Sequence, residues 1–325
     1  MTAVMTRVLL ALRVHRFELV AVTLLAVAVL AGSGGLLLRL LAFHLPVSCF
    51  TGGPVIDPTC AARQIDVNAY MAIAGNFGVP ALGGVVLLPI LSGLILGVAL
   101  VGKELDRGTA ALAWSVAPSR RAWLLDRVLP VALLIIAASL AAGLIADGLQ
   151  VARDPGTDPE RTFAHLGLRG VVVAAEGLFV FGVALAVGAR LGRVLPALIL
   201  SGVFAFAGYA GTTLLMDGFL HTETVTVNAS SLPPAGLTAW GIGKVLESRV
   251  RTPDGRVLTW EAAYNEYGDV GPGMPGYTGG FDDIYIVNPG ALYPIVEWRM
   301  TVIYGALGLA GIVLAFAIVE RRRPV

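Results

Sequence analysis

The feature that most constrains this chain is its clustering of apolar residues into long runs, several of which extend over about 20 residues without a charge. At 1.5 Å per residue, a helix of that length crosses the roughly 30 Å hydrocarbon core of a bilayer. Lipid offers no hydrogen bonds to the backbone, so each run must pair its own N–H and C=O groups as a helix. Only 14% of the residues are charged, and the mean hydropathy is +0.79. The sequence therefore predicts an all-α integral membrane protein.

The hydropathy pattern predicts six membrane-spanning helices. Their ranges are 17–40, 71–101, 124–146, 169–189, 194–216 and 300–319. The second is long enough to tilt or to extend beyond the bilayer, and Pro80 and Pro89 should bend it. Arg7, Arg13 and Arg16 precede the first run as in a signal peptide. That run is longer than the apolar core of a signal peptide, so we expect it to be retained as a span.

Basic residues gather in the short segments on one side of the six spans. They are Arg7, Arg13, Arg16, Lys103, Arg107, Arg120, Arg121, Arg127, Arg190, Arg193, Arg321, Arg322 and Arg323. The positive-inside rule makes this side cytoplasmic, with both termini inside, as an even number of spans requires. Arg far outnumbers Lys, and Ala, Gly and Val are abundant, as is typical of GC-rich bacterial genomes. We therefore expect a location in the inner membrane of a bacterium.

This topology divides the chain into three parts. Residues 1–216 carry the first five spans, residues 217–299 lie outside, and residues 300–325 form the sixth span and a basic cytoplasmic tail. Within the outer part, the sequence TPDGR at 252–256 is a strong turn signal between strand-like stretches at 248–251 and 257–260. We expect 217–299 to be a small α/β or β extracytoplasmic domain that contains this hairpin.

The sequence offers one candidate cross-link and no candidate metal site. Cys49 and Cys60 lie in the same outer loop, where thiols tend to oxidise, so we expect a disulfide, with free thiols as the alternative. The four histidines are scattered over different segments, without the H-E-x-x-H spacing of a zinc site.

The segment between the second and third spans, 102–123, carries the most information about function. Glu104 and Arg107 place charges at the exit of the second span, and Gly108-Thr109 can end that helix and begin another. Residues 109–116 then read as a short helix that exposes Leu112, Trp114 and Val116 outside the bilayer. An exposed apolar element in water is typical of a protein-docking site.

The end of this segment leads into the third span. Pro118-Ser119 should end the short helix, because the residue before a proline disfavours helical geometry. Arg120, Arg121 and Trp123 are then expected to seat the third span at the headgroup level.

This segment resembles the loop between the second and third spans of ABC exporter permeases of the second type. These are the six-span membrane subunits of bacterial drug, lipid and polysaccharide exporters. The matching residues are Glu104, Gly108, Thr109, Pro118, Ser119 and Arg120. The resemblance implies that 104–121, with Arg107 and Trp114, is a coupling helix that docks in a groove of a separate ATPase. The outer loop 217–299 is longer than in a minimal member, which leaves a periplasmic or cell-wall partner open.

The resemblance also implies a mechanism and partners. The sequence has no G-x-x-x-x-G-K-[ST] phosphate loop, so ATP and Mg²⁺ are expected on the ATPase, and this chain is not expected to be an enzyme itself. A dimer of ABC ATPase subunits, a second permease copy and the lipid bilayer are the expected partners, and no nucleic acid is expected. Movement of the coupling helix would rock the second and third spans and alternate access for an exported amphipathic substrate.

Several residues within the spans are candidates for a translocation path. Glu176 lies in the fourth span, where a charge costs about 3 kcal/mol, so it should face protein or a watery cavity. It is either a substrate or proton site or a helix–helix hydrogen bond. Asn76, Phe204 and Tyr209 either line the path or pack between helices.

Two other functions compete with transport. The chain could be a membrane anchor or receptor that displays 217–299, although this gives the 104–121 segment no role. It could also be a membrane-embedded, lipid-modifying enzyme, although the sequence lacks a cluster of His, Asp, Ser or Glu at the membrane surface.

Overall fold

The structure is a computed structural model that describes residues 13–50, 58–155, 158, 160–163, 166–228, 242–268 and 280–322. Within these ranges, six helices are long and apolar enough to cross a membrane. They are α2 (Arg16–Leu41), α4 (Gln64–Asp106), α6 (Arg120–Arg153), α7 (Gly170–Leu191), α8 (Val194–Thr222) and α10 (Tyr293–Arg321). The prediction of six spans is confirmed.

The fourth span, α7, lies at the centre of the bundle and packs on α4, α6, α8 and α10. Glycines make the closest of these approaches possible. A methyl group at Gly182 would lie 2.1 Å from the carbonyl oxygen of Gly308 in α10, and one at Gly97 would lie 2.6 Å from Ala184. Small residues at helix contacts are the usual way to bring helices together in lipid, where apolar burial gives little drive.

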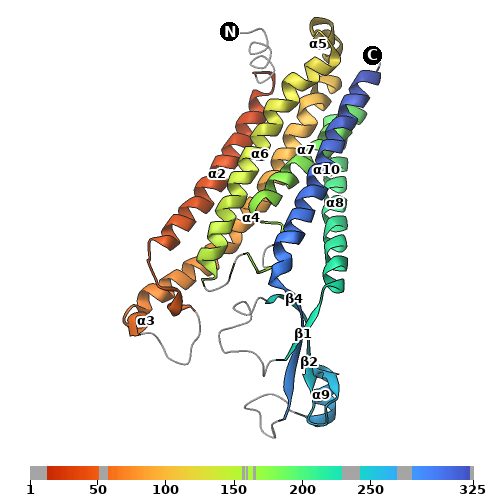
Figure 1. The fold of residues 1–325 in the computed structure, drawn as a ribbon. Helices are drawn as coiled ribbons and strands as arrows, with labels where there is room; N and C mark the ends of the chain where they lie inside the picture. The colour runs from red at the N-terminus through yellow and green to blue at the C-terminus, as the bar shows by residue number, and fades with distance from the viewer. Residues whose placement is uncertain are drawn as a thin grey trace.

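The two ends of the bundle differ (Figure 1). The start of α2, the end of α10 and the short helix α5 (Ala110–Val116) lie together at one end, here called the α5 end. The opposite end, here called the sheet end, carries the strands, η1 (Val47–Cys49) and α3 (Pro58–Ala62). Cys49 and Cys60 are joined by a disulfide there, with an S–S distance of 2.00 Å.

A four-stranded antiparallel sheet follows α8. Its order is β1-β4-β2-β3. The strands are β1 (Val225–Asn228), β2 (Ile242–Arg251), β3 (Val257–Thr259) and β4 (Asp282–Pro289), with α9 (Trp260–Tyr267) after β3 and η4 (Gly290–Leu292) leading into α10. The predicted hairpin is present as β2–β3, with Gly255 at a φ of +86° in its turn. The strand stops before Trp260 because the Thr259 side chain caps α9 by accepting from the Ala262 N–H at 3.2 Å.

The sheet begins and ends inside the predicted 217–299 range, since α8 runs to Thr222 and α10 starts at Tyr293. Tertiary contact extends these helices beyond the apolar runs. The buried Asn288 amide of β4 donates to the Leu220 carbonyl at 2.6 Å and to the Glu223 carbonyl at 3.0 Å. The free carbonyls at the end of α8 thus find donors in the sheet, and the helix continues to that contact.

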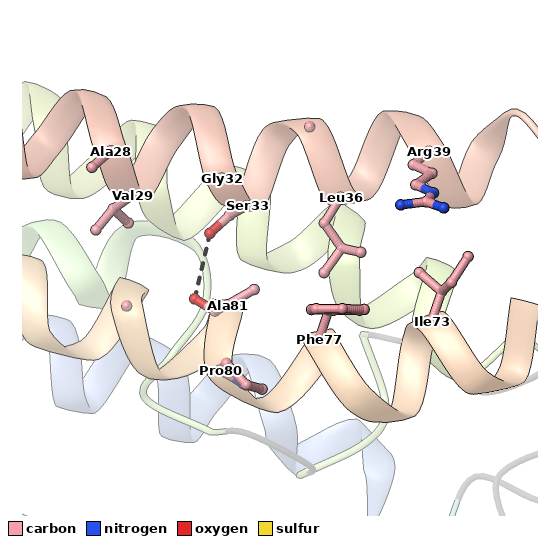
Figure 2. A pocket seen from close by; sticks show the side chains of 12 residues that line it. Ala28, Val29, Gly32, Ser33, Leu36, Arg39, Ile73, Phe77, Pro80 and Ala81 are labelled. Atoms are coloured by element: carbon pink, nitrogen blue, oxygen red, sulfur yellow. Dashed lines mark hydrogen bonds between the residues drawn. The ribbon is translucent and has the colours of Figure 1, made fainter.

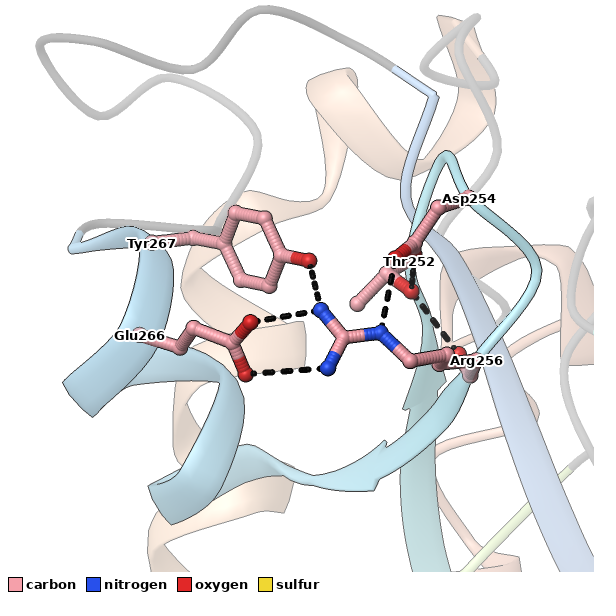
Figure 3. A network of polar contacts seen from close by, with 5 residues as sticks. All are labelled: Thr252, Asp254, Arg256, Glu266 and Tyr267. Carbon is pink, nitrogen blue, oxygen red and sulfur yellow. Dashed lines mark hydrogen bonds and ion pairs between the residues drawn. The ribbon is translucent and has the colours of Figure 1, made fainter.

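A polar network joins the hairpin turn to α9 (Figure 3). Arg256 donates to Asp254 at 2.7 Å, to Glu266 at 2.5 Å and to the Tyr267 hydroxyl at 2.5 Å. Thr252 donates to the Asp254 carboxylate and to the Arg256 carbonyl. Thr252 is buried, but the charged side chains of Asp254, Arg256 and Glu266 are about half exposed, so the network orders the turn without adding a buried ion pair.

Candidate functional site

The second span ends in a Schellman motif at the α5 end. Gly108 takes a left-handed φ of +68°, its N–H donates to the Leu105 carbonyl at 3.2 Å, and the Thr109 N–H donates to the Glu104 carbonyl at 3.0 Å. These two bonds satisfy carbonyls that the helix end leaves free, and the left-handed residue turns the chain sharply. Gly108-Thr109 therefore ends α4, as the sequence predicts.

The short helix α5 follows directly and stops after two turns. Ala117 is extended before Pro118, and Ser119 then caps α6 by accepting from the Ala122 N–H at 3.1 Å. Helices α4, α5 and α6 are thus connected by two tight turns with no intervening loop. Helix α5 is therefore directly continuous with the helices on both sides.

The side chains of α5 divide into an exposed and a packed side. Leu112 is 71% exposed, as predicted. Trp114 is instead partly buried, so the expected exposure of this residue is wrong. Its ring meets Trp123 of α6 edge-on at 6.0 Å, and the Arg120 guanidinium lies over it at 4.7 Å. Trp114 turns inward because these partners offer the large indole a packed site. The Val116 side chain lies outside the described parts.

At the start of the third span, Trp123 is enclosed by protein and is not a headgroup anchor, which corrects the expectation for this residue, while Arg120 bonds to α10. Trp123 is only 3% exposed. Arg120 donates to the Glu320 carbonyl at 3.0 Å and to the Arg322 carbonyl at 2.5 Å. These carbonyls close α10, and a cation is favourable at the negative end of a helix. Arg120 therefore connects α5, through Trp114, to the end of the last span.

Glu104 is buried rather than facing water at the exit of α4. Its carboxylate accepts from Arg127 of α6 at 3.1 Å, and its side chain is only 8% exposed. The His15 ring, next to α2, lies 4.0 Å from the same carboxylate. Lys103 also pairs with Glu18 of α2 at 2.5 Å. Charged pairs thus hold α2, α4 and α6 together beside α5, whereas Arg107 is exposed.

Sequence reasoning missed Arg127 and Glu18 as members of this site. Glu104 and Arg127 lie 23 residues apart, and Glu18 and Lys103 lie 85 apart. Neither separation follows a helical period, so no local pattern could have paired them. The signal that could have found Arg127 and Glu18 is that each is a charged residue beside an apolar run.

The candidate path residues do not form one cluster. Glu176 of α7 is buried, at 4% exposed, and the buried hydroxyl of Tyr209 of α8 lies beside its carboxylate. The rings of Tyr209 and Tyr304 are 5.4 Å apart, and Phe179 packs on both. Asn76 of α4 and Phe204 of α8 are exposed, away from this group. The structure brings together Glu176 and Tyr209 and leaves the other two on the outer surface.

Comparison with known proteins decides the family. A family model described as ABC-2 membrane transporter related matches residues 19–216. The chain belongs to this family. The match covers the larger part of the chain, from the first turn of α2 into α8, and includes all of the α4–α5–α6 connection. No curated protein and no solved structure matches it.

As an ABC-2 permease, the chain is a multi-pass membrane protein. The resemblance carried by the 104–121 segment is confirmed by the family match. Permeases of this family are the membrane components of transporters that work with an ABC ATPase. The sheet and α10 lie beyond the matched residues.

Proposed function

We propose that this ABC-2 permease is the transport subunit of an ATP-driven exporter in the inner membrane of a bacterium. The α5 end, with both termini, faces the cytoplasm, and the sheet lies outside. A separate ATPase dimer, which binds ATP and Mg²⁺, docks on α5 and drives an amphipathic substrate outward by alternating access. A second copy of the permease completes the path, because six helices are too few to enclose one in this family.

The construction of α5 is the observation that carries this proposal. The helix is fixed at one end by the Schellman motif at Gly108 and at the other by the Ser119 cap, while Leu112 is exposed between them. An exposed apolar side chain on such a rigid element is suited to insertion into a partner's groove. A push on α5 moves α4 and α6 directly, and it also moves α10 through Arg120.

The test is reconstitution of the full chain with the ABC ATPase that co-purifies with it. Leu112→Asp places a charge on the proposed docking surface and should abolish both binding of the ATPase and its stimulation by the permease. Val257→Asp is the matched control, because it places the same charge on an exposed apolar position of the sheet. Equal binding and stimulation in the Leu112→Asp variant and the wild type would contradict the proposal.

The role of Glu176 needs its own test. We propose that Glu176 and Tyr209 contribute to the translocation path. A carboxyl group buried within a membrane span lowers stability, so its presence there points to a functional role. Glu176→Gln keeps the shape and the hydrogen-bonding ability of the side chain but cannot ionise. Loss of transport with intact ATPase stimulation is the expected result. Unchanged transport would make Glu176 a helix–helix contact instead.

A further inference from the structure

A groove of about 620 Å³ runs along the outer surface of the bundle between α2 and α4 (Figure 2). Its size lies within the range of roughly 300–1,000 Å³ that is typical of small-molecule sites. The walls are apolar, with Val29 and Leu36 on α2 and Ile73, Phe77 and Pro80 on α4. The groove extends from Ala28 to Arg39, which is about 16 Å along a helix.

Glycines create this space. A methyl group at Gly32 or at Gly35 would meet nothing within 4 Å, so both positions open into the groove or beside it. Ser33 is the hydroxyl-bearing residue of the lining, and it is already satisfied, since its Oγ donates to the Ala81 carbonyl at 3.4 Å. The same bond holds α2 against α4. The groove therefore presents a hydrocarbon-like surface with no free hydroxyl.

A cation stands at one end of the groove. Arg39 lies in the last turn of α2, toward the sheet end, and its guanidinium extends over the gap toward Ile73 in Figure 2. Arg39 makes no ion pair or hydrogen bond within the described residues, whereas nearby Arg63 is paired with Asp66 at 2.9 Å. At the end of a membrane-spanning helix, an unpaired arginine reaches the level of the phospholipid phosphates.

We infer that this groove binds one phospholipid of the leaflet at the sheet end. Its phosphate pairs with Arg39, and one acyl chain lies along the groove past Phe77, Leu36 and Val29. The charge and the apolar length match an amphiphile with an anionic head. This inference requires only that the chain spans a membrane, so it stands independently of the proposed export function.

The positive charge of Arg39 argues against a second permease copy as the occupant of the groove. In a two-fold symmetric interface the same patch faces itself, so two Arg39 side chains would approach one another. The groove lining contains no acidic residue that could offset this repulsion. A phosphate supplies that negative charge.

The experiment is native mass spectrometry of the full chain released from nanodiscs that contain phosphatidylglycerol and phosphatidylcholine. The wild type is expected to retain one phosphatidylglycerol per chain. Gly35→Leu should fill the groove and abolish this retention. Gly202→Leu on α8 is the matched control, because a side chain there also meets nothing within 4 Å, and it should retain the lipid.

Three further variants separate headgroup recognition from the second-copy alternative. Arg39→Gln should bind phosphatidylglycerol roughly fivefold more weakly and lose its preference over phosphatidylcholine, while Arg39→Lys keeps the preference. Gly35→Cys adds the only free thiol of the chain, because Cys49 and Cys60 are already paired. Retention of lipid by Gly35→Leu, or a disulfide between two Gly35→Cys chains in the membrane, would overturn the inference.

Discussion

The two ends of this permease use the same kinds of charged contacts in opposite settings. At the α5 end, the side chains of Glu104 and Arg127 are 8% and 12% exposed. At the sheet end, those of Asp254 and Arg256 are 50% and 51% exposed. A buried pair is costly to break, because the remaining charge loses both water and partner, whereas water screens an exposed pair. The two ion pairs have similar N···O distances, 3.1 Å and 2.7 Å, but different effects. The buried pair holds helices together at the α5 end, whereas the exposed pair only orders a turn at the sheet end.

The largest effect is expected from breaking the buried pair. Arg127→Ala should lower the free energy of unfolding by about 3–5 kcal/mol, because it leaves the buried Glu104 carboxylate without its hydrogen-bonded partner. Denaturant titration of the purified protein in detergent measures this loss. Arg256→Ala is the control and should cost much less. Equal losses in the two variants would break the comparison between the ends.

The disulfide gives the sheet end its strongest local constraint. Cys60→Ser should lower the stability of the full chain by about 2–4 kcal/mol, since it releases the cross-link over 11 residues between Cys49 and Cys60. Thermal unfolding with and without reductant measures the effect. The reductant should shift the wild type to the midpoint of the variant and leave the variant unchanged; a shift of the variant would point to another cause.

Two glycines with positive φ, one at each end of the bundle, test whether only the α5 end affects the ATPase. Gly108→Ala and Gly255→Ala should each cost about 1–2 kcal/mol, because both positions are left-handed and both open into free space. Only Gly108→Ala, in the turn between α4 and α5, is expected to reduce ATPase stimulation as well. Stability and stimulation are measured on the same preparations. If both variants lose stimulation equally, the α4–α5 turn has no special role in coupling.

The smallest effect concerns acid at the sheet end. The Thr252 hydroxyl, followed by Arg256, lowers the pKa of the Asp254 carboxyl to about 2. Because the pKa is depressed in the folded state, this carboxylate stabilises the turn above pH about 3.8, its usual pKa, and the contribution fades as the pH falls through 2. Burial instead raises the pKa of Asp283, which opposes folding once that group ionises. Hydrogen exchange of the β2–β3 turn should show that protection in the wild type falls progressively as the pH drops from about 3.8 to about 2. In Asp254→Asn, this loss of protection should be absent, and the dependence on pH that remains should come from other groups such as Asp283.

Much of the architecture was readable from local sequence. Six apolar runs, five of them uncharged and the fourth interrupted by Glu176, predicted six spans, because a bilayer leaves a chain few alternatives to helices. The turn at 252–256 predicted the hairpin, and Gly108-Thr109 predicted the end of α4, since each depends on the backbone preferences of neighbouring residues. The order of Glu104, Gly108 and Pro118-Ser119 pointed to the family that the match to residues 19–216 shows.

Only the tertiary structure decided what the charged and aromatic side chains of the α5 end contact. Arg120 reaches carbonyls of α10 about 200 residues away, and Glu104 meets Arg127 across two helices. Trp114 faces inward because it packs against Trp123 and Arg120. The sequence of α5 alone does not specify these contacts. Hydropathy and turn preferences act between neighbours in the chain. The choice of ion-pair and aromatic partners is made only when the packed bundle brings distant residues together.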